Sequence, residues 1–399
     1  MVVCASPVSL CESSKEYVPL SLIEHFIQMP DPRMERTREH KLIDIIVIAI
    51  CAMLCGADSF VAIADFGEDK EEWLRQRLEL PNGIPSHDTF RRVFGLLNPE
   101  AFRKCFLSWT EGIRKHVSRE IIAVDGKTLR HSFDHTSEQS AIHMVSAWAA
   151  SSRLVLGQTK VNDKSNEITA IPEVLRLLDI SGCIVTIDAM GCQRGIATQI
   201  IEQGGDYVLA LKGNQGTLHN TVERFFKEER KENFNGQPFD YLETIDKDHG
   251  RIEKRRYWLV SNVSAWLDPQ GEWSGLGSIG MVESERFIQG KTVTETRYFI
   301  NSLSGKNMPE KSGTGAIKLF SRAVRRHWGI ENKVHWVLDV VFREDDCRIR
   351  KDFSPQNFAT LRHIVLNILN QNKGVKGSLK RRRLRAGWSD HHLEAILGI

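Results

Sequence analysis

Two aspartates of this 399-residue chain each end an apolar run, Asp125 in IIAVD and Asp188 in CIVTID. Runs of this kind are typical of strands buried on both faces, and chemistry in open α/β sheets gathers where such strands end. A third acid, Glu331, lies far downstream in the stretch RRHWGIENKVHWVLDVVF. We therefore expect the three carboxylates to share one site.

The spacing around Glu331 predicts a helix with one largely apolar face. The residues on that face lie three or four positions apart: Phe320, Val324, His327, Glu331, Val334 and Leu338. A carboxylate buried in such a stripe is costly unless a cation or a metal ion compensates it. Oxygen ligands from two or three acids suit Mg²⁺, and a pair of such ions suits phosphoryl transfer. The predicted chemistry is metal-assisted cleavage or joining of phosphodiester bonds.

Each of these acids also has a simpler structural interpretation. An aspartate at the end of a strand is often a turn former or the N-cap of the next helix. A glutamate in an apolar stripe often lies at its edge and pairs with a neighbour, here Arg326 or His335. One acid alone therefore does not define a site.

The residues around all three acids resemble a known family. The strings are IIAVDGKTLRHS, TIDAMGCQ, LALKGNQ, HGRIEKRRY and HWGIENKVHWVLDVVFREDDCRIRKD. They resemble the H-repeat-associated family of bacterial insertion-sequence transposases, within the broad DDE group, from about Ser21 to beyond Asn370. The resemblance implies an RNase H-like core in which Asp125, Asp188 and Glu331 bind metal. It also implies Mg²⁺, with Mn²⁺ as a substitute and two ions per site, and DNA as partner.

One departure from related transposase groups concerns the catalytic helix. Groups with a Tyr, Arg, Glu, Lys signature would require Tyr, Arg and Lys where this chain has Val324, His327 and Leu338. His327 or Arg326 is then the candidate for the phosphate contact. Asp339, two turns beyond Glu331, is the alternative third metal ligand.

The chain divides into four parts by its apolar pattern. Residues 1–17 are expected to be flexible, and residues 18–118 to form an all-helical N-terminal domain, since their apolar spacing is helical and prolines separate the helices. In its segment IPSHDTFRRVF, Ser86 is a plausible N-cap, and Arg91 and Arg92 are candidate DNA contacts. A plain surface helix is the alternative.

Residues 119–370 are expected to form an α/β catalytic domain. Strands are predicted at 121–125, 143–150, 154–161, 183–188 and 207–211, with helices near 167–178 and 196–202. That order of elements is typical of an RNase H-like core, in which the first and fourth strands are neighbours. The neighbouring strands would bring Asp125 and Asp188 within reach of one metal ion.

Further basic and polar residues are candidate DNA contacts. Lys127 follows the first strand, and Lys212, Asn214 and Gln215 follow the strand at 207–211, at the sheet end where the aspartates lie. A β-rich insertion is expected at about 217–298, where Arg251, Lys254, Arg255 and Arg256 give a positive face. An exposed hairpin that contacts the DNA backbone is favoured there over a solvated ribbon.

Composition adds limits to this interpretation. The formal net charge is +3, but residues 371–399 form a basic tail that is either solvated or in contact with phosphates. Eight cysteines show no CxxC pair, so neither a zinc site nor a disulfide is expected. The most apolar segment, 45–57, is too short for a membrane span, and we expect a cytoplasmic protein.

Together these features predict an insertion-sequence DDE transposase that cleaves and transfers DNA strands at transposon ends and acts as a homodimer on DNA. Two alternatives stay open. One is a DNA-binding relic that no longer cuts, and the other is an RNase H-like nuclease that acts on RNA or hybrids. Metal-dependent cutting and a requirement for 2′-hydroxyl groups distinguish the three.

Overall fold

The computed structural model describes residues 18–115, 117–133, 141–161, 166–232, 234–235, 238–248, 251–288, 291–303, 315–372 and 374–399. The segment 1–17, expected to be flexible, lies outside the described residues. No helix in the described ranges combines the length and the apolar character that crossing a bilayer requires.

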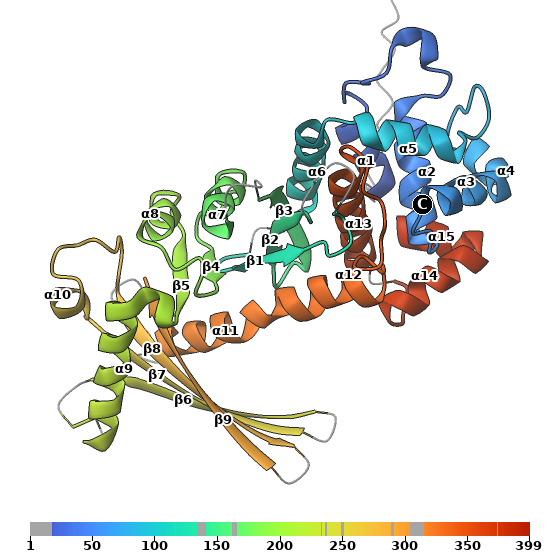
Figure 1. The fold of residues 1–399 in the computed structure, drawn as a ribbon. Helices are drawn as coiled ribbons and strands as arrows, with labels where there is room; N and C mark the ends of the chain where they lie inside the picture. The colour runs from blue at the N-terminus through green and yellow to red at the C-terminus, as the bar shows by residue number, and fades with distance from the viewer. Residues whose placement is uncertain are drawn as a thin grey trace, which may run out of the picture.

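The chain contains a nine-stranded mixed sheet in the order β3-β2-β1-β4-β5-β9-β8-β7-β6, whose strands are labelled in Figure 1. Its first half contains β1 (Ile121–Thr128), β2 (His143–Ala149), β3 (Leu154–Lys160), β4 (Ile184–Ile187) and β5 (Asp206–Leu211). β1, β2 and β3 form an antiparallel meander, whereas β4 runs parallel to both β1 and β5. The predicted adjacency of the first and fourth strands is therefore confirmed.

Two helices cross over on one face of this half-sheet. They are α7 (Glu167–Arg176) and α8 (Arg194–Glu202), whose apolar residues share a core with the even-numbered residues of β1, such as Ile122 and Val124. Ile121, an odd-numbered residue, belongs instead to a core with α11 (Gly315–Ile330). Because successive strand residues alternate between faces, the helix pair and α11 cover opposite sides of the sheet.

The inserted region extends the same sheet. It comprises α9 (Gly216–Lys231), β6 (Asp240–Asp248), β7 (Arg251–Ser261), α10 (Ser264–Leu267), β8 (Ser278–Ile288) and β9 (Lys291–Asn301). β9 pairs with β5, and β8, β7 and β6 follow in antiparallel order. The four strands project away from the helical end of the molecule as a twisted ribbon (Figure 1).

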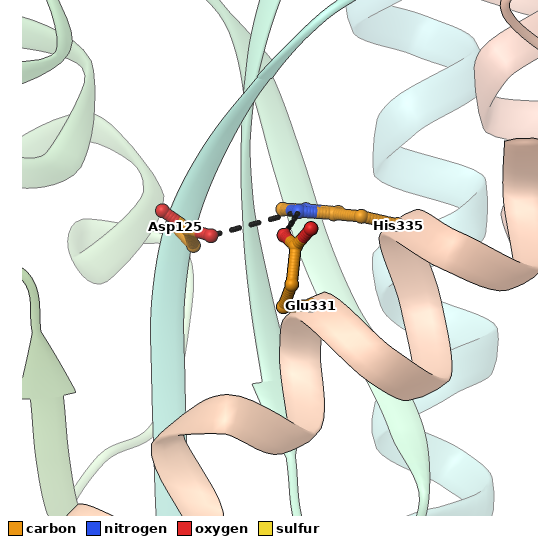
Figure 2. Close-up of side chains that lie close together, drawn as sticks. All are labelled: Asp125, Glu331 and His335. Carbon is orange, nitrogen blue, oxygen red and sulfur yellow. Dashed lines mark hydrogen bonds and ion pairs between the residues drawn. The ribbon is translucent and has the colours of Figure 1, made fainter. Parts of the chain in front are cut away.

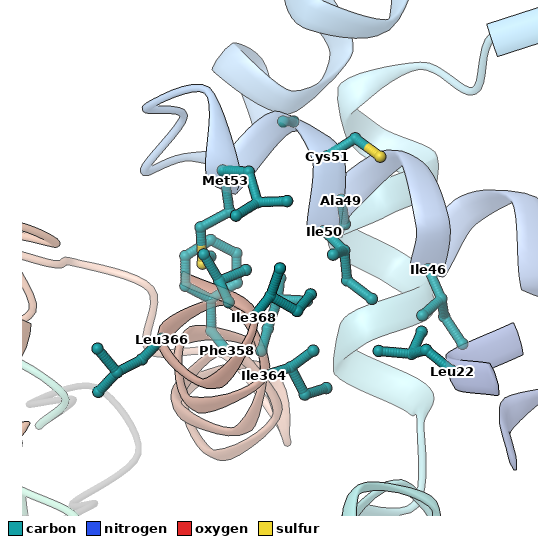
Figure 3. Packing of buried hydrophobic residues seen from close by; sticks show 14 of the residues in the cluster. Leu22, Ile46, Ala49, Ile50, Cys51, Met53, Phe358, Ile364, Leu366 and Ile368 are labelled. Carbon is teal, nitrogen blue, oxygen red and sulfur yellow. The ribbon is translucent and has the colours of Figure 1, made fainter. Parts of the chain in front are cut away.

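The N-terminal helices form one core with the C-terminal helices. The first set is α1 (Val18–Phe26), η1 (Glu35–Thr37), α2 (Leu42–Leu54), α3 (Phe60–Asp69), α4 (Glu71–Arg75), α5 (His87–Leu96) and α6 (Pro99–Ile113). The second set is α13 (Ser354–Gln371), α14 (Leu379–Trp388) and α15 (Asp390–Leu397). Ile50 and Met53 of α2 lie beside Phe358 and Ile368 of α13 (Figure 3). The helical region is thus packed with the end of the chain and not by itself.

Two asparagines of α13 join its neighbours by hydrogen bonds. The side-chain amide of Asn357 donates to the carbonyls of Phe94 and Leu97, at 2.8 and 2.9 Å, where α5 ends. Asn367 pairs with the backbone of Val155 in β3, accepting from its N–H at 2.8 Å and donating to its carbonyl at 2.9 Å. The helix α13 therefore connects α5 to the edge of the sheet.

The basic segment after residue 371 is folded for most of its length. Arg383 is buried, donates to the carbonyl of Met53 at 2.7 Å and lies over the ring of Phe342. Arg382 is also buried and donates to the carbonyl of Asn372 at 2.7 Å. The interpretation of these two arginines as solvated or bound to phosphate is therefore wrong, because both side chains are buried and donate to backbone carbonyls.

Candidate active site

The register of the sheet sets the two aspartates side by side. Val124 of β1 faces Ile187 of β4, so the next residues in the same register are Asp125 and Asp188. Both have the parity of Ile121 and Ile184, which point to the face that α11 covers. The two carboxylates therefore enter the same space between sheet and helix.

Glu331 reaches this space from a π-helical turn. The turn spans Glu331–His335 and joins α11 to α12 (Trp336–Val340), so the three form one long helical stretch. Such wide turns are rare and are frequent at functional sites. Figure 2 shows Glu331 and His335 pointing from this turn toward Asp125 on β1.

The expectation that Glu331 is buried is wrong. Its side chain is 55% exposed, although Val334 and Ile330 nearby are buried. The π turn contains an extra residue, which interrupts the three-to-four spacing of the apolar stripe at this point. Glu331 consequently faces an open pocket instead of the core.

The pocket has a volume of about 460 Å³. It is bounded by the ends of β4 and β5, by β9 and by α11, and all three acids line it. Its other polar and aromatic lining includes Lys212, His219, Arg297, Tyr298, His327 and Trp328. The structure thus brings Asp125, Asp188 and Glu331 to one cavity, as the sequence predicted.

The electrostatics of Asp125 indicate a missing positive charge. Burial, and then the nearby carboxylates of Asp188, Glu167 and Glu331, raise the pKa of Asp125 to about 7. In the part of the chain that the structure describes, no Lys or Arg side chain forms an ion pair with any of the three site acids. Crowded acids without a basic partner fit a divalent cation.

Asp188 also forms the turn that its position allows. Its Oδ1 accepts the backbone N–H of Met190 at 3.1 Å and that of Gly191 at 3.4 Å. The interpretation of this residue as a turn former is therefore confirmed. It is compatible with metal binding, because the second carboxylate oxygen is left for the pocket.

His335 completes the group that could hold a metal ion. Its Nδ1 lies 3.1 Å from Glu331 Oε2 and 3.5 Å from Asp125 Oδ2, and the ligand atoms of the three residues lie within 4.8 Å of one another. Burial lowers the pKa of His335, although Glu331 opposes that effect. The sequence indicated His335 only as a partner of Glu331; its approach to Asp125 depends on the fold and was missed.

Lys127 and Asp339 pair with each other next to this site. The Lys127 ammonium contacts Asp339 and lies 2.7 Å from Glu344, and its side chain is only 12% exposed. Burial alone would lower the pKa of Lys127, but Glu344 and Asp339 outweigh it and raise the pKa. Lys127 is therefore not free for DNA, and the geometry favours Glu331 over Asp339 as the third ligand.

The residues after β5 divide into a pocket residue and two anchors. Lys212 is exposed and lines the pocket. The amide of Asn214 donates to the carbonyl of Ala189 at 2.7 Å, and that of Gln215 donates to the carbonyl of Cys192. These two side chains hold the loop after β5 against the loop that carries Asp188, so both amides already have a structural partner.

The two candidates on α11 for a phosphate contact, His327 and Arg326, differ in charge and in position. His327 lines the pocket, but burial lowers its pKa to about 4, and its Nδ1 lies 3.0 Å from the hydroxyl of Thr186. A neutral imidazole cannot replace a cationic side chain. Arg326 is outside the pocket lining and donates to the hydroxyl of Ser151 at 2.6 Å.

The expected positive face of the insertion is largely neutralised. Lys254 pairs with Glu243 at 2.9 Å, and Arg255, which is buried, pairs with Asp246 at 2.7 Å and with Glu253. Acids on β6 and β8 likewise surround Arg256. The acids come from neighbouring strands, which the linear sequence did not reveal. Arg251 begins β7, and its side chain lies outside what the structure describes.

The helix α5 lies in the helical region, away from the strands β4 and β5 (Figure 1). Ser86 is confirmed as its N-cap, since its hydroxyl accepts the N–H of Thr89. Arg91 pairs with Asp88 at 2.9 Å, and Arg92 is exposed. The structure therefore presents both arginines on the surface of α5, but at a distance from the three site acids.

Comparison with protein families identifies the class to which this fold and site belong. The family described as Transposase DDE domain matches residues 117–368, and a region described as DDE_Tnp_1-associated matches residues 23–110. The chain belongs to the DDE transposase family, whose members are enzymes that cleave and transfer DNA strands with a divalent metal ion.

Individual relatives place it further within that family. The H repeat-associated protein YhhI of Escherichia coli (strain K12) is 41% identical over 380 residues, which are 94% of this chain and 97% of YhhI. Protein YncI of Escherichia coli O157:H7 is 40% identical over 94% of both chains. The expected membership of the H-repeat-associated transposases is confirmed. A solved synaptic complex of piggyBac transposase with hairpin DNA has a TM-score of 0.42 at 11% identity and covers 96% of this chain and 79% of that chain.

Proposed function

We propose that this protein catalyses metal-dependent cleavage and strand transfer at the ends of an insertion sequence. The observation that carries the proposal is the set of three acids, Asp125, Asp188 and Glu331, which line one pocket and pair with no lysine or arginine among the described residues. A protein that kept such a set only for stability would gain by neutralising it. Family membership supplies the reaction class for which this arrangement is suited.

We further propose that the half-sheet β1 to β5 with α7, α8 and α11 is an RNase H-like core. Its support is the strand order β3-β2-β1-β4-β5, in which β2 alone runs opposite to the other four strands. In this arrangement the insertion 217–298 lies between the strand β5 and the helix that carries Glu331. Ligands in open α/β sheets bind at the ends of such parallel strands, where both aspartates lie.

In this mechanism Asp125, Asp188 and Glu331 would hold Mg²⁺, or Mn²⁺ in its place. Two such ions bound there would supply Lewis-acid activation of a hydroxyl and neutralisation of phosphate charge. Two basic residues at the pocket are candidates to position the strand. Lys212 has no ion-pair partner among the described residues, whereas Arg297 of β9 already pairs with Glu295 at 2.7 Å. Asn214 and Gln215 fix the loop beside Asp188. No protein nucleophile is required, because water or a DNA 3′-hydroxyl attacks the phosphate.

DNA is the substrate in this proposal, and α5 with Arg91 and Arg92 is the candidate contact outside the pocket. Two transposon ends must be held together, so we propose that the protein acts as a homodimer on DNA. We also propose that it is cytoplasmic, because the chromosome is accessible in that compartment. The N-terminal helices match a region associated with the transposase domain, which agrees with a supporting role in DNA binding.

The experiment that tests the proposal measures nicking of a plasmid that carries the flanking DNA of this gene, with Mg²⁺ or Mn²⁺. Wild type, Asp188→Asn and the surface control Asp65→Asn are compared, and DNA binding is measured in parallel. We expect cuts at the flanks from wild type and the control, and none from Asp188→Asn, which should still bind DNA.

Two other outcomes assign the protein to the alternatives. DNA binding without cutting by any of the three proteins identifies a silent relic. Cutting that requires 2′-hydroxyl groups and ignores the flanking sequence identifies a nuclease for RNA or hybrids. Nicking by Asp188→Asn at the wild-type rate contradicts the assigned role of that aspartate.

A further inference from the structure

We infer that His335 is a fourth ligand at the metal site and coordinates the ion through Nδ1 beside Asp125 and Glu331. This inference rests on the proposed function, because it assumes that the three acids bind a divalent ion. It adds a nitrogen donor to a site otherwise made of carboxylates. A mixed site of this kind should discriminate between metal ions differently from three acids alone.

The first observation is where the ring points. Nδ1 of His335 is 3.1 Å from Glu331 Oε2 and 3.5 Å from Asp125 Oδ2, whereas the two acids come from different elements, β1 and the π turn. Figure 2 shows the His335 ring pointing toward Asp125, with the Glu331 carboxylate beside the same end of the ring. An ion bound by both acids would meet this nitrogen from the same side.

The second observation is the surroundings of the ring. His335 is 5% exposed, so water does not satisfy its nitrogens, and Nε2 has no hydrogen-bond partner among the described residues. Leaving a buried polar group without a hydrogen-bond partner costs free energy. An apolar side chain would fill the same space without that cost, so packing alone does not explain a histidine here. Burial therefore holds the ring in place, and among the described residues its Nδ1 forms ion pairs with the two site acids, Asp125 and Glu331.

The third observation is that the π turn brings the two residues together. Glu331 and His335 are the first and last residues of the turn, and His335 Nδ1 contacts Glu331 Oε2 across it. Frequent association of such turns with functional sites agrees with a ligand pair at these positions. The turn thus supplies two of the proposed ligands, and β1 and β4 supply the aspartates.

The donor type determines which ions the site should prefer. Mg²⁺ strongly favours oxygen ligands, whereas Mn²⁺ also accepts imidazole nitrogen. Loss of the imidazole should then weaken binding of Mn²⁺ more than binding of Mg²⁺. If His335 only donates a hydrogen bond to Glu331, its loss should weaken both ions alike, so the two roles are separable.

The test uses the full chain loaded with Mn²⁺ in the absence of DNA. Pulsed electron paramagnetic resonance detects a nitrogen atom that coordinates Mn²⁺, and the affinities for Mn²⁺ and Mg²⁺ are measured by titration. Wild type, His335→Gln and the control His219→Gln are compared; His219 lines the same pocket but is outside the ligand group.

We expect nitrogen coupling in wild type and in His219→Gln and no coupling in His335→Gln. The Mn²⁺ affinity of His335→Gln should fall by about tenfold, with a smaller change for Mg²⁺. Isotopic labelling of histidine in the wild-type protein should change the coupling pattern, and this measurement is valid even if the His335→Gln protein folds poorly.

The remaining outcomes separate this inference from the proposed function. Mn²⁺ bound to wild type without nitrogen coupling, or with coupling unchanged in His335→Gln, overturns the role of His335 alone. A wild-type protein that binds no Mn²⁺ overturns the metal site itself, and with it the proposed function.

Discussion

Asp125 and Lys127 lie two residues apart on β1 and point to the same face of the sheet. The acids around Asp125 are uncompensated, however, whereas those around Lys127 are neutralised. Asp125 is among acids that pair with no described lysine or arginine, and burial lowers the pKa of their histidine neighbour, His335. Lys127 is among acids that it neutralises, because its ammonium contacts Asp339 and Glu344, and Arg362 pairs with Glu344 from the other side at 3.3 Å.

The comparison separates two uses of acidic residues. Although Glu344 is fully buried, Arg362 and Lys127 hold its pKa below the usual value. The pKa of Asp125 is raised to about 7, because burial and like charges act on it without compensation. We expect the balanced group, which is Lys127, Asp339, Glu344 and Arg362, to stabilise the fold. We expect the unbalanced group, which is Asp125, Asp188 and Glu331, to bind a cation from solution.

The largest effect is expected in the balanced group. Glu344→Gln leaves Arg362 and Lys127 short of a negative charge in a buried place, and breaking a buried pair in this way costs about 3 to 5 kcal/mol. Chemical denaturation should show this loss, whereas the surface control Asp65→Asn should leave the transition unchanged. A loss under about 1 kcal/mol, the size typical of exposed pairs, would contradict the assignment of Glu344 to a buried structural network.

At Asp125 we expect the opposite effect, which is a gain in stability when the acid is removed. Its pKa is about 7 in the fold and near 3.8 when exposed, so the folded protein loses stability as the pH rises from about 4 to 7 and stays at the lower value above that. Since one pKa unit corresponds to about 1.4 kcal/mol, Asp125→Asn should stabilise the metal-free protein by roughly 2 to 4 kcal/mol at pH 8. The gain should vanish near pH 4. Denaturation curves over this pH range test the sign, and a destabilised variant at pH 8 contradicts it.

Metal addition should remove the imbalance. At a free Mg²⁺ concentration one hundred times its dissociation constant, binding to the folded state adds about 2.7 kcal/mol of stability. Thermal unfolding with and without Mg²⁺ should show this gain for wild type and for Asp65→Asn, but much less for Asp125→Asn. An equal gain in Asp125→Asn means that the ion binds elsewhere.

The smallest effect concerns two lysines that differ in compensation. Lys212 has no ion-pair partner among the described residues and lines the pocket, whereas Lys254 pairs with Glu243 at 2.9 Å. Lys212→Ala should weaken DNA binding severalfold. It should also reduce the slope of log affinity against log salt concentration by about one, as loss of one phosphate contact does. Lys254→Ala serves as the control and should change neither. Binding curves at several salt concentrations decide between them, and equal effects of the two variants contradict the distinction.

The sequence predicted the scaffold of the site well because its signals are local. The apolar runs that end at Asp125 and Asp188 are strands, the predicted neighbouring strands pair, and Ser86 caps its helix. Strand identity, crossover direction and capping each depend on residues close together in the chain. These features were enough to bring two of the three acids together in the correct register.

The charge balance could not be predicted, because it depends on distant contacts. Lys127 is separated from its partner Glu344 by more than two hundred positions, and Arg383 meets Met53 from the other end of the chain. The π turn at Glu331 is a local feature without a sequence signal, since five residues are too few for their apolar spacing to distinguish a π-helix from an α-helix. The exposure of Glu331 and the approach of His335 to Asp125 both follow from that turn.

The hydrogen bonds of Asn357 and Asn367 have a geometric consequence for DNA. They fasten α13 to the end of α5 on one side and to β3 on the other, within a continuous core. A duplex held by Arg91 and Arg92 would therefore meet the pocket at a constant number of base pairs from that contact. Inserting half a helical turn, about five base pairs, between the bound sequence and the cut should rotate the scissile bond away from the acids and abolish nicking. If DNA that carries the insertion is nicked at an unchanged rate, the helices and the pocket bind DNA independently of each other.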